Sequence, residues 1–85
     1  MKQFSYVVKD ELGIHVRPAG LLVKKAASFQ SSVKISKGEK EADAKRILGL
    51  MGLAVKKGDT AVFTIEGPDE EEAAAALQQF MEENL

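Results

Sequence analysis

The sequence predicts one two-layer α+β domain with the element order βαββαβα. Alternating apolar residues, which are typical of strands, and apolar residues three to four positions apart, which are typical of helices, follow one another along the 85 residues. No linker, repeat or low-complexity tract interrupts them, so we expect residues 1–85 to form a single domain. Strands and helices that are interspersed in this way favour a helix layer on one face of a sheet.

The first half of the chain contains a strand, a helix and a hairpin. Phe4, Tyr6 and Val8 alternate along a predicted first strand, which the turn-forming residues 10–13 end. Residues 16 to about 27 carry apolar side chains at helical spacing and are predicted to form the first helix. Segments 31–37 and 40 to about 44 read as two short strands, joined where Gly38 tolerates the positive φ of a tight turn.

The second half is predicted to contain a short helix, a strand and a final helix. Segment 45–55 is apolar but includes two glycines, so its helix must be held by packing. Residues 60–66 alternate as a last strand. Asp69 is placed to cap the final helix, with Glu72 at the capping-box position. The buried stripe of this helix is predicted to contain Ala73, Leu77, Phe80 and Met81.

The composition excludes several classes of function. Apolar residues make up 45% and charged residues 29%, which are ordinary globular values. The absence of cysteine excludes disulfides and thiolate metal sites, and a single histidine cannot supply a multi-imidazole zinc shell. We therefore expect no metal and no organic cofactor. No apolar run approaches the roughly 20 residues of a membrane span, and a strand pattern starts at once without a signal peptide, so we expect a cytoplasmic protein that does not insert into membranes.

Charge is unevenly distributed along the chain. The first 60 residues carry 12 basic and 6 acidic groups, whereas residues 61–85 carry 7 acidic groups and no basic one. Such segregation can steer an acidic partner toward one face, although a solvated acidic helix at the carboxyl end is the simpler explanation. Nucleic acid is not an expected partner, because the net charge is -1 and aromatic residues make up only 6%.

Segment 13–19 places a histidine, a cation and a helix start within one turn. Pro18 is tolerated only in the first turn of a helix, so His15 is the cap or its neighbour. Backbone amides at such a position lack helical acceptors and can bind an anion. An imidazole is partly unprotonated near neutral pH and can attack phosphorus, after which the amides of Val16 and Arg17 and the guanidinium of Arg17 could bind the phosphoryl group. The alternative is a histidine that occupies a helix start without a chemical role.

The sequence Gly13-Ile14-His15-Val16-Arg17-Pro18-Ala19 resembles the active-site signature of the HPr family, the histidine-containing phosphocarriers of the phosphoenolpyruvate-dependent phosphotransferase system. Residues 45–51 resemble the second signature of this family, and the likeness extends over essentially the whole chain. The resemblance implies an open-faced β-sandwich, in which three helices cover one face of a four-stranded antiparallel sheet. It also implies a monomer that acts as a stoichiometric carrier and is not an enzyme by itself.

In that family, enzyme I phosphorylates the histidine and an enzyme IIA domain receives the group. The resemblance therefore assigns the phosphoryl group to Nδ1 of His15, its stabilisation to Arg17, and part of the helix start to Pro18. It assigns a partner-binding apolar patch to Ile47, Leu48 and Met51. Three cations could form the rim of this patch: Lys24, Lys45 and Arg46. The pattern itself makes the short helix apolar on more than one side, with burial expected for Leu50, Leu53 and Val55 rather than for Leu48.

Arg46 marks a departure from the family. Many low-GC Gram-positive members carry a serine there, which a kinase phosphorylates during carbon catabolite repression. An arginine cannot be modified in this way, so that corepressor role does not transfer to this chain. A noncatalytic regulatory module that binds partners through Ile47, Leu48 and Met51 is the alternative function, and His15 is the residue that separates it from a carrier. A small RNA-binding domain ranks below both, since a basic aromatic platform is lacking.

Overall fold

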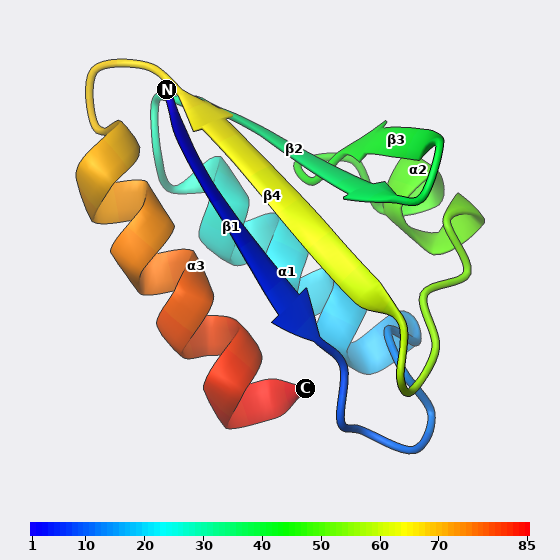
Figure 1. The fold of residues 1–85 in the computed structure, drawn as a ribbon. Coiled ribbons are helices and arrows are strands. Elements are labelled where there is room, and N and C mark those ends of the chain that lie inside the picture. Colours follow the sequence, from blue (N-terminus) through cyan, green and yellow to red (C-terminus); the bar gives the residue numbers. More distant parts are fainter.

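The computed structural model describes residues 1–85 and confirms the predicted order of elements, with three helices on one face of a four-stranded sheet (Figure 1). The elements are β1 (Lys2–Val7), α1 (Val16–Ala27), β2 (Ser32–Lys37), β3 (Lys40–Asp43), α2 (Ile47–Gly52), β4 (Thr60–Glu66) and α3 (Glu70–Asn84). The strand order is β1-β4-β2-β3, and every neighbouring pair is antiparallel. This architecture is the open-faced β-sandwich that the resemblance implied.

Three strand ends differ by one residue from the prediction, and α2 covers only residues 47–52 of the predicted segment 45–55. β1 ends at Val7, so Val8 lies just outside the strand. The other two strand ends are explained by hydrogen bonds. β2 begins at Ser32 because the amide of Ser31 is hydrogen-bonded to Asp69 instead of to a strand. β3 ends at Asp43, whose carboxylate accepts the amide of Lys45 at 2.9 Å and so turns the chain toward α2. α1 and β4 have the predicted bounds.

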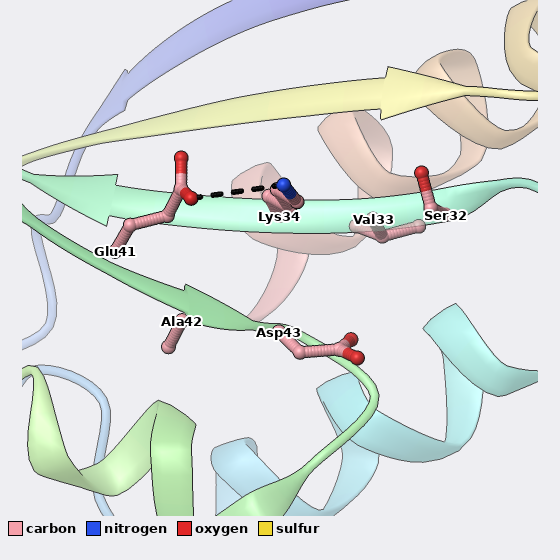
Figure 2. Close-up of a pocket in the computed structure, with 6 residues that line it drawn as sticks. All are labelled: Ser32, Val33, Lys34, Glu41, Ala42 and Asp43. Atoms are coloured by element: carbon pink, nitrogen blue, oxygen red, sulfur yellow. Dashed lines mark ion pairs between the residues drawn. The ribbon is translucent and has the colours of Figure 1, made fainter.

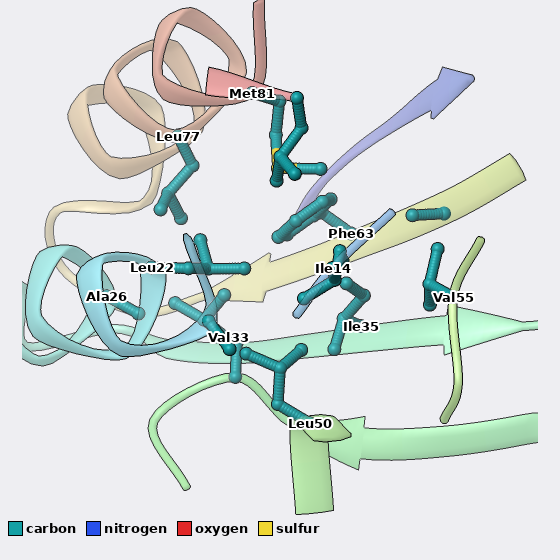
Figure 3. Close-up of a cluster of buried hydrophobic side chains, with 14 of the residues drawn as sticks. Ile14, Leu22, Ala26, Val33, Ile35, Leu50, Val55, Phe63, Leu77 and Met81 are labelled. Atoms are coloured by element: carbon teal, nitrogen blue, oxygen red, sulfur yellow. The ribbon is translucent and has the colours of Figure 1, made fainter. Parts of the chain in front are cut away.

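The core lies between the sheet and the helices (Figure 3). Alternate residues of β2 and β4, such as Ile35 and Phe63, meet Leu22 of α1 and Leu77 of α3. Burying an aliphatic or aromatic side chain of this size stabilises a fold by about 1.5–3 kcal/mol, so these contacts orient the helices on the sheet. In α3 the predicted stripe is confirmed at its buried members, while Phe80 is only half-buried. No helix has the length and the apolar character that crossing a membrane requires.

The predicted capping box of the last helix is wrong. Asp69 is the residue before α3, but its side chain makes no capping hydrogen bond, and Glu72 takes no part. The Asp69 carboxylate instead accepts hydrogen bonds from the amides of Gln30 and Ser31, both at 2.9 Å, and from the hydroxyl of the buried Ser31. Three donors from a distant segment outcompete the local amides. Glu70 takes over part of the local role and accepts the amide of Gly67 at 3.2 Å.

The Asp69 carboxylate is therefore expected to stabilise the fold in a pH-dependent manner. Hydrogen bonds from the Ser31 hydroxyl and the Gln30 amide lower the pKa of Asp69 below its ordinary value of 3.8. A lowered folded-state pKa means that this stabilisation is present above pH 3.8 and is lost as the pH falls further, through the folded-state value. Asp69→Asn should therefore unfold at a lower temperature than the wild type at neutral pH, with a difference that shrinks below pH 3.8.

Thermal unfolding between pH 7 and pH 2 measures this difference. Glu71→Gln is the matched control, since it removes one charge from the same helix start at an exposed side chain that accepts no backbone amide. Asp59 and Glu70, whose pKa values are also lowered, are retained in both variants and cancel in the comparison. A Glu71→Gln profile identical to that of Asp69→Asn would contradict the assignment.

Candidate functional site

The loop before His15 is fixed by a close approach of two backbone segments. Gly13 has a φ of 67° and donates its amide to Asp10 at 2.9 Å. A Cβ atom at Gly13 would lie 2.3 Å from the carbonyl oxygen of Val55, so only glycine fits there. The next amide, that of Ile14, donates to this same Val55 oxygen at 2.9 Å, and the Ile14 side chain is buried. The segment before His15 is thus held by backbone hydrogen bonds and by the buried side chain of Ile14.

His15 is the N-cap of α1, as its position before Pro18 predicted. Its backbone is extended, with φ -110° and ψ -174°, and its carbonyl accepts the amide of Ala19 at 2.8 Å. The imidazole is half-buried and makes no capping hydrogen bond. The amides of Val16 and Arg17 have no acceptor in the chain, and Pro18 has no N–H. The ring therefore stands beside two free backbone donors at the positive end of a helix.

Three of the predicted site residues line one hollow. His15, Arg17 and Pro18 surround an open cavity of about 250 Å³. Pro18 is buried, whereas Arg17 is exposed and forms no ion pair. The guanidinium is therefore available to an incoming anion. Val16 belongs to the same helix start through its amide, but its side chain is 69% exposed and does not line the hollow.

The same hollow includes residues that the sequence did not indicate. Asp10, Leu21 and Asn84 complete its lining. The end of α3 reaches this point because the Leu85 carbonyl accepts the amides of Lys9 at 2.6 Å and Asp10 at 2.8 Å. Figure 1 shows this arrangement, in which the carboxyl end of the chain lies at the same end of the molecule as the loop after β1. Helical spacing from Arg17 could have indicated Leu21, but no local signal connects Asn84 with His15.

Helix α2 presents apolar side chains to solvent. Leu48 is 86% exposed and Ile47 is 40% exposed, while Met51 is half-buried. Leu50 is completely buried, and Leu53 and Val55 nearly so, as the sequence predicted. Because α2 packs against α1, this apolar surface neighbours the helix that begins at His15. Its residues do not line the His15 hollow.

The three predicted rim cations have different surroundings. The half-buried Lys45 donates its ammonium group to the carbonyl of Phe29 at 2.9 Å and so ties the link between β3 and α2 to the end of α1. Arg46 is the N-cap of α2 and is exposed, with Nε 4.0 Å from the carboxylate of Asp43. Lys24 is exposed, forms no ion pair and lies on the face of α1 that turns toward α3.

A second cavity, of about 200 Å³, lies between β2 and β3 and is unrelated to these residues. Figure 2 shows its lining, where Lys34 and Glu41 form an ion pair at 3.8 Å across the two strands. The charges of Lys34 and Glu41 therefore neutralise each other. The structure contains no group of three or more His, Cys, Asp and Glu side chains that is placed to hold a metal ion.

The fold and the site together define a class of protein, namely a small open-faced β-sandwich with a solvent-accessible histidine at the beginning of its first helix. A family model described as the PTS HPr component phosphorylation site matches residues 2–83. The phosphocarrier protein HPr of Lysinibacillus sphaericus is 46% identical over 98% of this chain and 94% of its own length. This chain therefore belongs to the HPr family of phosphocarriers in the phosphotransferase system.

Solved structures agree with this family. HPr-C-His from Thermoanaerobacter tengcongensis superimposes with a TM-score of 0.93, at 40% identity over 96% of this chain and 92% of that one. Crh, described as a Bacillus subtilis catabolite repression containing protein that forms a dimer with a swapping domain, superimposes with a TM-score of 0.78. It is 38% identical over 100% of this chain and 98% of its own. The family thus includes dimeric structures.

Proposed function

We propose that His15 accepts a phosphoryl group from enzyme I and passes it to an enzyme IIA domain. One observation carries the proposal: an accessible imidazole lies at a helix start with two free amides and an unpaired guanidinium beside it. In this proposal residues 1–85 act as one domain and as a monomer. The chain is a stoichiometric intermediate, whose histidine is phosphorylated in the first transfer and regenerated in the second.

The transfer requires a nucleophile and groups that stabilise the negative charge of the phosphoryl oxygens. A lone pair of the unprotonated imidazole attacks the phosphorus, a P–N bond forms, and the bond to the donor breaks with its electron pair left on the donor. The amides of Val16 and Arg17 then donate to phosphoryl oxygens, and the Arg17 guanidinium neutralises their charge. In the second transfer a nucleophile of the enzyme IIA domain attacks the phosphorus and forms the new bond, while the P–N bond breaks and its electron pair returns to the ring. By family resemblance the bonded atom is Nδ1.

Incubation with enzyme I and phosphoenolpyruvate tests the proposal. Intact mass measurement should show the gain of one phosphate, and mild acid should remove it, as expected for a phosphoramidate. Addition of an enzyme IIA domain should return the chain to its original mass. A chain that stays unmodified under conditions in which a known HPr is labelled would overturn the proposal.

The exposed surface of α2 is proposed as part of the partner interface, with Ile47, Leu48 and Met51 as its apolar contacts. These residues adjoin the His15 helix without contributing to the core in the way that Leu50 does. Lys45 and Arg46 lie beside them, and Lys45 acts partly through its structural bond to Phe29. A regulatory module would use the same surface but would not need His15, so we favour the carrier.

Leu48→Asp is expected to weaken binding of enzyme I about tenfold or more, because it places a desolvated charge in an apolar contact. Folding should be unaffected, since 86% of this side chain is exposed. Calorimetric titration with enzyme I measures the affinity. Ala75→Asp is the control, as it adds the same charge at an exposed apolar position of α3. Equal affinities of the two variants would exclude Leu48 from the interface.

A further inference from the structure

One lysine of the sheet holds the chain segment between α2 and β4. Lys37, the last residue of β2, donates its ammonium group to the carbonyl of Ala54 at 2.9 Å. The same group forms an ion pair with the carboxylate of Asp59 at 3.0 Å, and both side chains are half-buried. We call residues 54–59 the 54–59 link. A single side chain therefore ties both ends of this link to the sheet.

The backbone of the 54–59 link has a conformation that needs such support. Ala54 has a φ of 53° and is the only residue other than glycine with a positive φ. This left-handed conformation is unfavourable for a residue with a Cβ atom. The Asp59 carboxylate also accepts the amide of Lys56 at 2.8 Å and closes a tight turn. The Lys56 amide and the Lys37 ammonium group lower the pKa of Asp59 below 3.8, so the carboxylate is charged at neutral pH.

The 54–59 link carries the loop that leads to His15. At one end of this loop, the amide of Val8 donates to the Asp59 carbonyl at 3.0 Å, and the Val8 carbonyl accepts the amide of Gly58 at 2.8 Å. At the other end, the amide of Ile14 donates to the carbonyl of Val55, the residue after Ala54. Figure 1 shows the loop after β1 and the link before β4 at the same end of the molecule. Both ends of loop 8–14 thus rest on the link.

We infer that Lys37 and Asp59 are positioning residues for phosphoryl transfer at His15. They hold the 54–59 link, and the link holds the backbone from which the imidazole projects. The inference rests on the proposed function, because transfer needs the imidazole and the free amides of α1 in one geometry. A displacement of about 1 Å can slow a reaction about a hundredfold. Neither Lys37 nor Asp59 lines the His15 hollow, so their effect must pass through the backbone.

Amide hydrogen exchange of the free chain tests the first step of this inference. Lys37→Met removes both contacts of the ammonium group. The amide of Ile14 should then exchange about tenfold faster, while the amides of β4 keep their wild-type rates, because only the link opens. Lys34→Met is the matched control, since it removes a cation from the same strand whose ion pair stays within the β2–β3 hairpin. Equal acceleration at Ile14 and in β4, or no acceleration, would refute the positioning role.

Phosphorylation kinetics with catalytic enzyme I and excess phosphoenolpyruvate test the second step. Lys37→Met should lower kcat about tenfold and leave the KM for the chain unchanged, because the binding surface is intact. Asp59→Asn should also lower kcat, since Lys37 then holds only one end of the link. Lys37→Arg, whose guanidinium can donate to both groups, should restore kcat. A raised KM with an unchanged kcat would indicate direct contact with enzyme I and would refute the positioning role.

The wild type separates this inference from the proposed function. A wild type that gains no phosphate would refute the carrier function itself. A wild type that is phosphorylated, while Lys37→Met and Asp59→Asn keep the kcat of Lys34→Met, would refute the positioning role and leave the carrier function intact.

Discussion

His15→Ala is expected to gain no phosphate from enzyme I and phosphoenolpyruvate, whereas the wild type gains one. The substitution removes the only imidazole of the chain, and no cysteine is present to replace it as a nucleophile. The fold should persist, because the His15 side chain makes no capping hydrogen bond and only its backbone closes the first turn of α1. Intact mass measurement before and after acid treatment gives the result.

His15→Asn is the stricter version of this experiment. Asparagine is among the favoured N-cap residues, so this variant should unfold at the same or a higher temperature than the wild type and still remain unlabelled. Arg17→Gln, which keeps the nucleophile but removes the guanidinium, should reach one phosphate at a rate reduced about a hundredfold. Labelling of His15→Ala to the wild-type level would disprove the assigned nucleophile.

Gly13→Ala is expected to lower the free energy of unfolding by about 3 kcal/mol and to slow phosphorylation of His15. An alanine at φ 67° is strained by about 1–2 kcal/mol. Its Cβ would also lie 2.3 Å from the Val55 oxygen and 2.6 Å from the Lys56 Cα, and overpacking of this kind costs about 1–3 kcal/mol. Both contacts are with backbone, so relief requires the loop before His15 to move.

Gly38→Ala provides a matched control for that change. Gly38 has nearly the same φ, 61°, but no atom lies within 4 Å of the position that its Cβ would take. This variant should show the conformational strain alone and should be phosphorylated at the wild-type rate. Denaturant unfolding and phosphorylation rates of the two variants give both comparisons. Equal losses of stability would show that the approach to Val55 contributes nothing.

Much of the site follows from local sequence because its parts are close along the chain. Pro18 fixes the first turn of α1, so the position of His15 at the N-cap could be predicted. Helical spacing within α2 indicated apolar residues on more than one side, and burial was expected for Leu50 rather than for Leu48, as the structure shows. Gly13 could be recognised as a turn residue. Its contact with Val55 could not, since that contact joins two loops 42 positions apart in the printed sequence.

The role of Asp69 shows why local rules can fail. A carboxylate before a helix, followed by a glutamate three residues later, satisfies the capping-box pattern. The structure brings the amides of Gln30 and Ser31 to the same carboxylate, and these donors bind it instead. The pattern describes only the donors near in sequence. The competing donors depend on how the loop after α1 is placed against the start of α3.

The sequence by itself determined the order of the elements, the helix start at His15 and the faces of the helices, because apolar periodicity and the restricted backbone of proline act over a few residues. Only the tertiary structure decided the strand order, the bond of Asp69 to Ser31, and the meeting of Asp10, Leu21 and Asn84 around His15. These features join residues that are far apart in sequence. They depend on the path of the whole chain, and this path is fixed by the packing of the helices on the sheet.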